Sequence, residues 1–182
     1  MALTYTPNAQ LGTPCPDFSL PSVDGKTMAL GDFSGSQVLV VMFICSHCPY
    51  VQAIEERLIA LGQAFPKHQV QLVGICANDW ADYPEDSPEN LFLRWQEKGY
   101  SFPYLVDESQ NVAKSFGAVC TPDIFVYDNN RRLTYRGRLD DSWKDPSQVT
   151  QRDLHQAIEK TLQNKPIESE QVPSMGCSIK WK

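Results

Sequence analysis

The sequence predicts an α/β fold, a sandwich in which helices cover a mixed β-sheet. Two short runs of apolar and β-branched residues, at 37–44 and 69–77, are typical of strands that are buried on both faces. Strands alternate with stretches of helical character, which is the pattern of parallel strands joined by helices. A short turn at 128–130 then joins two further strands, which must run antiparallel.

The size and charge of the chain set limits on its class. Its 182 residues are enough for one domain with a hydrophobic core, and 42% hydrophobic and 21% charged residues are typical of a globular protein. The net charge of -6 argues against a nucleic-acid partner, which needs a basic surface. We expect a single domain over residues 1–163 and a C-terminal tail over 164–182 that packs on or near it.

The start of the chain shows neither a basic region nor an apolar segment of the kind found in export signals. No run of about twenty apolar residues indicates a membrane span. We therefore expect a cytoplasmic protein that does not interact with membranes. In a reducing compartment its cysteines should not form a static disulfide framework. The six cysteines are Cys15, Cys45, Cys48, Cys76, Cys120 and Cys177.

The first half of the chain gives clear signals for its elements. Residues 1–16 indicate an extended arm, and the turn signal Asp24-Gly25-Lys26 separates two short strands. After the strand at 37–44, apolar residues recur at three- and four-residue spacing, which predicts an amphipathic helix. The apolar positions of this helix are Val51, Ile54, Leu58, Leu61 and Phe65. Ser87-Pro88-Glu89 predicts the start of another helix, since Ser caps helices and Pro suits their first position.

The second half of the chain completes the sandwich. A strand at 102–106 and a short helix at 110–116, closed by Gly117, precede the hairpin. The hairpin strands are expected at 123–127 and 132–139. The last helix is predicted to begin after a capping Thr150, and its apolar positions are Leu154, Ala157, Ile158 and Leu162.

The strongest chemical signal is the motif Cys45-Ser46-His47-Cys48-Pro49, where a buried strand ends and a helix begins. The first turn of a helix has unpaired N–H groups and the positive end of a dipole, and both stabilise a thiolate. Two residues between the cysteines bring the sulfurs within bonding reach. We expect Cys45 at the exposed edge as the attacking thiol and Cys48 deeper as the resolving thiol.

His47 is expected to tune this pair. A partly protonated imidazole beside a thiolate stabilises the dithiol form and makes the disulfide more oxidising, so replacing His47 by Pro should lower the reduction potential. A zinc site would need a second Cys or His pair, and none follows. A copper site would need a remote histidine, and only His68 and His155 remain, in polar surroundings. No metal is therefore expected.

Several segments together resemble the thioredoxin superfamily, and more closely its redoxin branch, which includes peroxiredoxins of the alkyl hydroperoxide reductase and thiol-specific antioxidant type. The likeness extends over residues of about 12 to 163, and it is closest to a bacterial subgroup of thioredoxin-like thiol–disulfide oxidoreductases and isomerases. The segments that carry it are 14–20, 30–35, 43–51, 83–89 and the C-terminal 176–182.

The resemblance implies a thioredoxin fold, a three-layer α/β/α sandwich with an N-terminal β extension. It also implies a cis-proline at Pro122 that faces the cysteines, with Thr121 pairing with the backbone of a substrate peptide. The sequence supports this position independently, since Pro122 lies at the start of a strand. The implied substrate is a disulfide-containing protein or a small thiol, and the implied electron donor is thioredoxin or glutathione. No cofactor is expected beyond the Cys45–Cys48 disulfide, because no dinucleotide-binding motif is present.

The chain also departs from its relatives. Ile44 stands where thioredoxins have Trp, and residues 38–44 lack the acid that usually accepts the proton of the deeper cysteine. Cys45 and Val41 break the peroxiredoxin pattern before Cys48. The leading hypothesis is therefore a thiol–disulfide oxidoreductase. The alternatives are a thiol peroxidase or peroxide sensor, and a non-catalytic interaction or metallochaperone module.

The remaining four cysteines lie outside the motif. Cys120 precedes Thr121, so it is a candidate for an additional redox thiol. Cys177 is a second candidate, because a flexible tail would carry it back to the pair as a resolving thiol or an intramolecular substrate. Cys76 and Cys15 are expected to pack in the core. The acidic segment 79–86 is expected to be a solvated loop.

Overall fold

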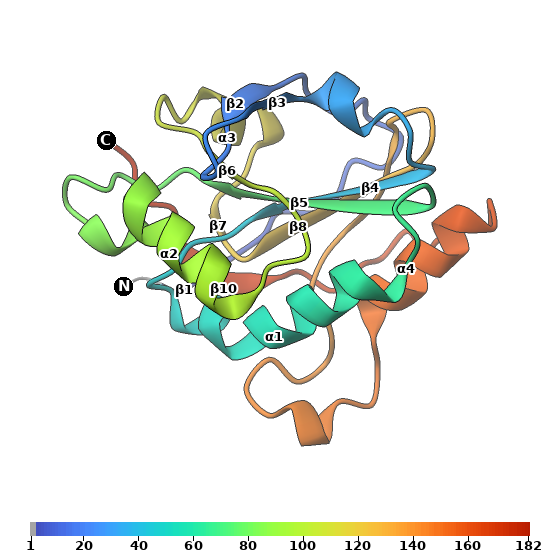
Figure 1. Cartoon of the computed structure of the whole chain (residues 1–182). Coiled ribbons are helices and arrows are strands. Elements are labelled where there is room, and N and C mark those ends of the chain that lie inside the picture. The colour runs from blue at the N-terminus through green and yellow to red at the C-terminus, as the bar shows by residue number, and fades with distance from the viewer. Residues whose placement is uncertain (1–2) are drawn as a thin grey trace.

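The computed structural model describes residues 3–182, and a five-stranded mixed sheet lies at its centre (Figure 1). The strand order is β6-β5-β4-β8-β9. Strands β4, β5 and β6 run parallel, and β8 and β9 are antiparallel to their neighbours. These strands span Val38–Phe43 (β4), Val70–Cys76 (β5), Tyr104–Val106 (β6), Asp123–Tyr127 (β8) and Leu133–Arg136 (β9). The mixed sheet agrees with the prediction from sequence.

Helices cover both faces of this sheet. Figure 1 shows α1, α2 and α4 on one face, and α3 with the β2–β3 hairpin on the other. The helices span Pro49–Ala64 (α1), Pro88–Lys98 (α2), Asn111–Phe116 (α3) and Asp153–Leu162 (α4). The hairpin strands are Ser19–Pro21 (β2) and Thr27–Ala29 (β3), and short 3-10 turns lie at Leu30–Phe33, Pro84–Asp86 and Pro146–Gln148.

Strand β4 has no solvent-exposed face, so its residues divide between two hydrophobic cores. Val38, Val40 and Met42 pack towards α1 and α4, and Leu39, Val41 and Phe43 pack towards α3 and the β2–β3 hairpin. The alternation follows from the two-residue period of a strand. A continuous apolar run is therefore what a central strand with helices on both sides requires.

The ends of the helices show where local sequence decides structure. Ser87 caps α2 by accepting a hydrogen bond from the Asn90 backbone at 3.3 Å, and Gly99 ends the helix in the left-handed conformation, as predicted. The expected cap at Thr150 is wrong, since α4 begins only at Asp153. The Thr150 hydroxyl donates instead to the carboxylate of Asp141, an earlier loop residue.

A second, three-stranded sheet joins both ends of the described chain. Its order is β1-β10-β7, with Leu3–Tyr5 (β1), Met175–Ser178 (β10) and Cys120–Thr121 (β7), and all pairs are antiparallel. The C-terminal segment therefore supplies the central strand of this sheet. Among residues 3–182, no helix combines the length and the apolar character needed to span a bilayer.

Candidate redox site

The two cysteines of the motif lie where β4 passes into α1. Cys45 follows the end of β4 by two residues, and Cys48 is the residue that precedes the first turn of α1, with Pro49 at the first helical position. Pro49 fits there because the first N–H groups of a helix have no partner within the helix. The predicted position of the motif between strand and helix is therefore confirmed.

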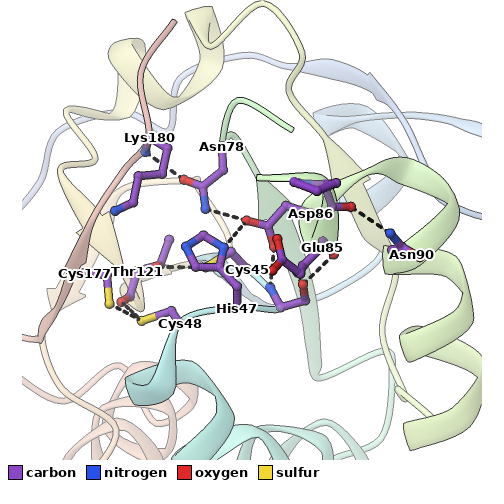
Figure 2. A network of polar contacts seen from close by, with 12 residues as sticks. Cys45, His47, Cys48, Asn78, Glu85, Asp86, Asn90, Thr121, Cys177 and Lys180 are labelled. Atoms are coloured by element: carbon purple, nitrogen blue, oxygen red, sulfur yellow. Dashed lines mark hydrogen bonds and ion pairs between the residues drawn. The ribbon is translucent and has the colours of Figure 1, made fainter. Parts of the chain in front are cut away.

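The Thr121–Pro122 peptide bond is cis, as the resemblance implied, and Thr121 contacts both cysteines. The Sγ atom of Cys45 lies 3.2 Å from Thr121 Oγ1, and the Sγ atom of Cys48 donates to the Thr121 carbonyl at 3.1 Å. Figure 2 shows these side chains converging from opposite directions. The segment before the cis-proline thus forms one wall of the site.

Burial is more complete than the sequence suggested. Cys45 is only 2% exposed and Cys48 is fully buried. The expectation that Cys45 lies at an exposed edge is therefore wrong. Thr121 lies against its sulfur, and the next residue, Ser46, ties the motif to the 84–86 turn by donating through its hydroxyl to the Glu85 carbonyl at 2.6 Å.

Cys177 completes the group of sulfurs. It lies in β10, directly opposite Thr121 in the strand register. Its Sγ atom is 2.9 Å from the Sγ atom of Cys48 and shares a hydrogen bond with it (Figure 2). The tail cysteine therefore reaches the pair from an ordered strand, and not from the flexible tail that the sequence suggested.

The other three cysteines are buried as well. The Cys120 thiol contacts the Pro122 carbonyl at 3.6 Å, and burial raises its pKa. Cys76 is buried in β5, and Cys15 is buried against the core on the α3 face, as expected. Burial raises the pKa of Cys15 to about 12 and that of Cys76 well above its usual range. These three thiols have the character of packing residues.

A buried carboxylate, Asp86, holds the motif in place. One of its oxygens accepts hydrogen bonds from the Ser46 backbone at 2.7 Å and from the Ser46 hydroxyl at 2.8 Å. The other accepts from the Asn78 amide at 2.8 Å and lies 2.6 Å from Nδ1 of His47. Asp86 is fully buried, so the expectation of a solvated acidic loop is wrong for this residue.

Sequence reasoning did not assign Asp86, Asn78 or Ser46 to the site. A signal for Asp86 was present, because it directly precedes the helix start Ser87-Pro88 and lies in a segment that carries the family resemblance. Residues 38–44 lack a buried acid, and the structure supplies one from the loop that follows β5. The acid reaches the motif from another part of the sequence.

His47 lies between this acid and the ring of Tyr83. The two rings stack with their centroids 5.0 Å apart and an interplanar angle of 15°. Ligand atoms of Cys45, His47 and Asp86 lie within 4.8 Å of one another, which is close enough to share one metal ion. Both Asp86 oxygens accept hydrogen bonds within the protein, whereas Nε2 of His47 is buried and has no hydrogen-bond partner among the described residues.

The surroundings of the two motif cysteines shift their pKa values in opposite directions. Hydrogen bonding from the Cys45 thiol, together with contributions from Cys177 and the Val51 N–H, lowers the pKa of Cys48 to about 5. Desolvation is the main cause that raises the pKa of Cys45, and the nearby charge of Asp86 adds to it. The two shifts run in opposite directions, which favours ionisation of Cys48 before Cys45.

A cavity of about 370 Å³ opens beside the cis-proline. Its walls include Pro122, Tyr50 of α1 and Trp143, with the last two rings 4.5 Å apart between centroids. Val172 and Met175 of the C-terminal segment also line it. Apolar walls with a few polar groups are typical of a site that takes a small molecule.

Comparisons with known proteins place this site in a family. A family model described as AhpC/TSA family matches residues 11–136. A solved structure of an uncharacterized conserved protein from Geobacillus kaustophilus is 41% identical and superposes with a TM-score of 0.94, covering 100% of this chain and 97% of that one. A thiol:disulfide interchange protein of the thioredoxin family from Chlorobium tepidum, 19% identical, has the same fold with a TM-score of 0.64, covering 86% of this chain and 99% of that one.

Curated relatives point to two related activities. The thiol-disulfide oxidoreductase ResA of Bacillus thuringiensis subsp. konkukian is 25% identical over 126 residues, which are 68% of this chain and 67% of ResA. A Mycobacterium tuberculosis relative, provisionally named a peroxiredoxin, is 30% identical over 118 residues, 64% of this chain and 69% of that protein. The thioredoxin fold, the redoxin-family match and these relatives agree with one another and do not support a non-catalytic module. The chain belongs to the AhpC/TSA family of the thioredoxin superfamily and is an oxidoreductase of the thiol–disulfide class.

Proposed function

We propose that Cys45 and Cys48 form the dithiol–disulfide couple through which this enzyme reduces or exchanges disulfides. The observation that carries the proposal is geometric: both cysteines contact Thr121, the residue before the cis-proline, and Cys48 directly precedes α1. The lowered pKa of Cys48, about 5, supports it. A thiolate at neutral pH is the species that attacks disulfides. The cytoplasmic thiols thioredoxin and glutathione are the electron donors that we propose.

The pKa of Cys48 is lowered and that of Cys45 is raised, which favours Cys48 as the attacking thiol and Cys45 as the resolving thiol, the reverse of the roles expected from the sequence. The Cys48 thiolate attacks one sulfur of the substrate, a mixed disulfide forms, and the second substrate sulfur leaves as a thiolate that takes up a proton. Cys45, once deprotonated, attacks the Cys48 sulfur and releases the rest of the substrate as a thiol. Two electrons have then passed to the substrate, and two donor thiols return them by reducing the Cys45–Cys48 disulfide.

Trapping the mixed disulfide tests these roles. The double variant Cys45→Ser/Cys177→Ser keeps Cys48 as the single thiol of the centre, and Cys48→Ser/Cys177→Ser keeps Cys45. We expect the first variant to form a stable adduct with glutathione disulfide much faster than the second, as measured by intact mass. Adduct formation at Cys45 alone would restore the order expected from the sequence, and no adduct in either variant would refute the couple.

A thiol peroxidase is the second candidate, and the Cys48 thiolate together with the peroxiredoxin-like relative favours it. In that reaction the Cys48 thiolate attacks one oxygen of hydrogen peroxide, the O–O bond breaks, and hydroxide leaves and takes up a proton to become water. Cys48 becomes a sulfenic acid, which a second thiol converts to a disulfide with release of another water. Stopped-flow oxidation with hydrogen peroxide separates the two candidates. A rate no higher than that of a free thiol excludes the peroxidase.

A further inference from the structure

A third cysteine, Cys177, lies beside the Cys45–Cys48 pair, and a couple of two cysteines does not need it. A four-residue strand from the far end of the chain, β10, runs against the segment before the cis-proline. It places a third sulfur 2.9 Å from Cys48. Strand addition to such an edge is the way in which extended peptides are commonly recognised.

The approach of this strand is unusually close. A Cβ atom on Gly176 would lie 1.9 Å from the carbonyl oxygen of Thr121 and 2.5 Å from its carbonyl carbon, so only glycine fits at this point. The same Thr121 carbonyl accepts from Cys48 at 3.1 Å. The backbone of β10 is therefore built to lie against the residue that contacts the redox pair.

Both sides and the end of β10 are held in place. Leu3 of β1 pairs with Cys177 on the side away from Thr121. Beyond the strand, the Ile179 N–H donates to the Val119 carbonyl at 3.1 Å, and the Lys180 N–H donates to the Asn78 side chain at 2.9 Å. Asn78 also binds Asp86, so the tail and the motif share one hydrogen-bond network (Figure 2). Cys177 is thus fixed in position.

We propose that the C-terminal strand is a built-in substrate and that Cys177 is the third redox residue of the centre, forming a disulfide with Cys48. This inference rests on the proposed Cys45–Cys48 couple and extends it. Because the strand fills the edge of β7, it takes the place that a disulfide-containing polypeptide would need there.

The exchange step balances without an outside oxidant. Starting from the Cys45–Cys48 disulfide, the deprotonated Cys177 sulfur attacks the Cys48 sulfur. The Cys48–Cys177 bond forms as the Cys45–Cys48 bond breaks, and Cys45 leaves as a thiolate that takes up the proton lost by Cys177. The oxidation state of the protein is unchanged, and two donor thiols later reduce the Cys48–Cys177 disulfide.

The test maps disulfides in the full-length protein after oxidation with diamide, by mass spectrometry of non-reduced digests. The variant Cys45→Ser leaves the tail intact, and we expect it to form the Cys48–Cys177 disulfide in most molecules. Cys177→Ser should form only Cys45–Cys48, and the wild type should contain both. Cys120→Ser is the matched control, since it removes a buried thiol near Pro122, and its map should equal that of the wild type.

The outcomes separate this inference from the proposed function. If Cys45→Ser leaves Cys48 and Cys177 unlinked while the wild type forms Cys45–Cys48 and reduces disulfides, the role of Cys177 is refuted and the couple stands. If Cys48–Cys177 forms in Cys45→Ser but the wild type never forms Cys45–Cys48 and turns over no disulfide, the couple is refuted and the reactivity of Cys177 stands.

Discussion

At the scale of single residues, the chemistry depends on groups that are far apart in the sequence. The spacing of Cys45 and Cys48 identifies the pair and its place before a helix. The sequence does not reveal that Asp86 binds Ser46 and approaches His47, because those contacts join residues about forty positions apart. The motif is therefore predictable from local sequence, and its electrostatic environment is not.

We predict that reduced protein contains a thiolate at neutral pH that belongs to Cys48. Since its pKa is lowered to about 5, the thiolate is present above that pH and is lost as the pH falls through it. Thiolate absorbance near 240 nm should therefore rise with a midpoint near pH 5 in the wild type and in Cys120→Ser. The transition should be absent in Cys48→Ser, and a midpoint in all variants close to the ordinary cysteine value would contradict the assignment.

A second prediction concerns Asp86. Replacing it by Asn keeps an acceptor for Ser46 but removes the charge beside His47 and adds an unneeded donor in a buried site. We expect the free energy of unfolding to fall by about 1–3 kcal/mol, the usual cost of an unsatisfied buried polar group. Urea denaturation measures this loss. Asp82→Asn is the control in the same loop, and it should change little because Asp82 is exposed.

At the scale of elements, hydrophobic periodicity predicts most of the sandwich. The buried strands, α1, the capped α2 and the hairpin all have strong local patterns, and the structure contains each of them. Strand β10 has no such pattern, since Met-Gly-Cys-Ser contains a single large apolar residue. Its conformation comes from pairing with β1 and β7, which no local signal encodes.

The close contact at Gly176 gives an element-scale prediction. In Gly176→Ala the new methyl group would collide with the backbone of Thr121, which cannot move aside as a flexible side chain does. We expect β10 to detach or shift, with a loss of about 1–3 kcal/mol of stability and faster amide exchange at Thr121. Gly31→Ala is the control, because nothing lies within 4 Å of the position of its Cβ. Equal stability of both variants would contradict the tight docking of β10.

At the scale of the whole molecule, access to the buried sulfurs limits the size of the disulfide substrates that can react. Cys45, Cys48 and Cys177 are all buried, and β10 occupies the edge of β7. The cavity beside Pro122, at about 370 Å³, offers room for a small molecule. We therefore expect a small disulfide to reach Cys48 more readily than a folded polypeptide, which would have to displace β10 from the edge of β7.

We accordingly predict that hydroxyethyl disulfide is reduced at least about tenfold faster than insulin, which corresponds to about 1.4 kcal/mol in barrier. Gly176→Ala should narrow this ratio by opening the edge of β7 to insulin. The two rates can be followed in one coupled assay with the same thiol donor. Equal rates for both substrates in the wild type would show that the tail does not obstruct a polypeptide.

The pairing of β1 with β10 also has a mechanical consequence. The two strands are antiparallel, with Leu3 opposite Cys177. The N-terminal end of β1 and the C-terminal end of β10 therefore lie side by side at the same end of the ladder. A force that pulls the termini apart would therefore open the β1–β10 ladder one hydrogen bond after another, once the contacts of residues 179–182 have given way. Strands opened in this manner resist only weak forces. Strand β10, which covers the redox centre, should therefore be the first strand of this molecule to detach under tension.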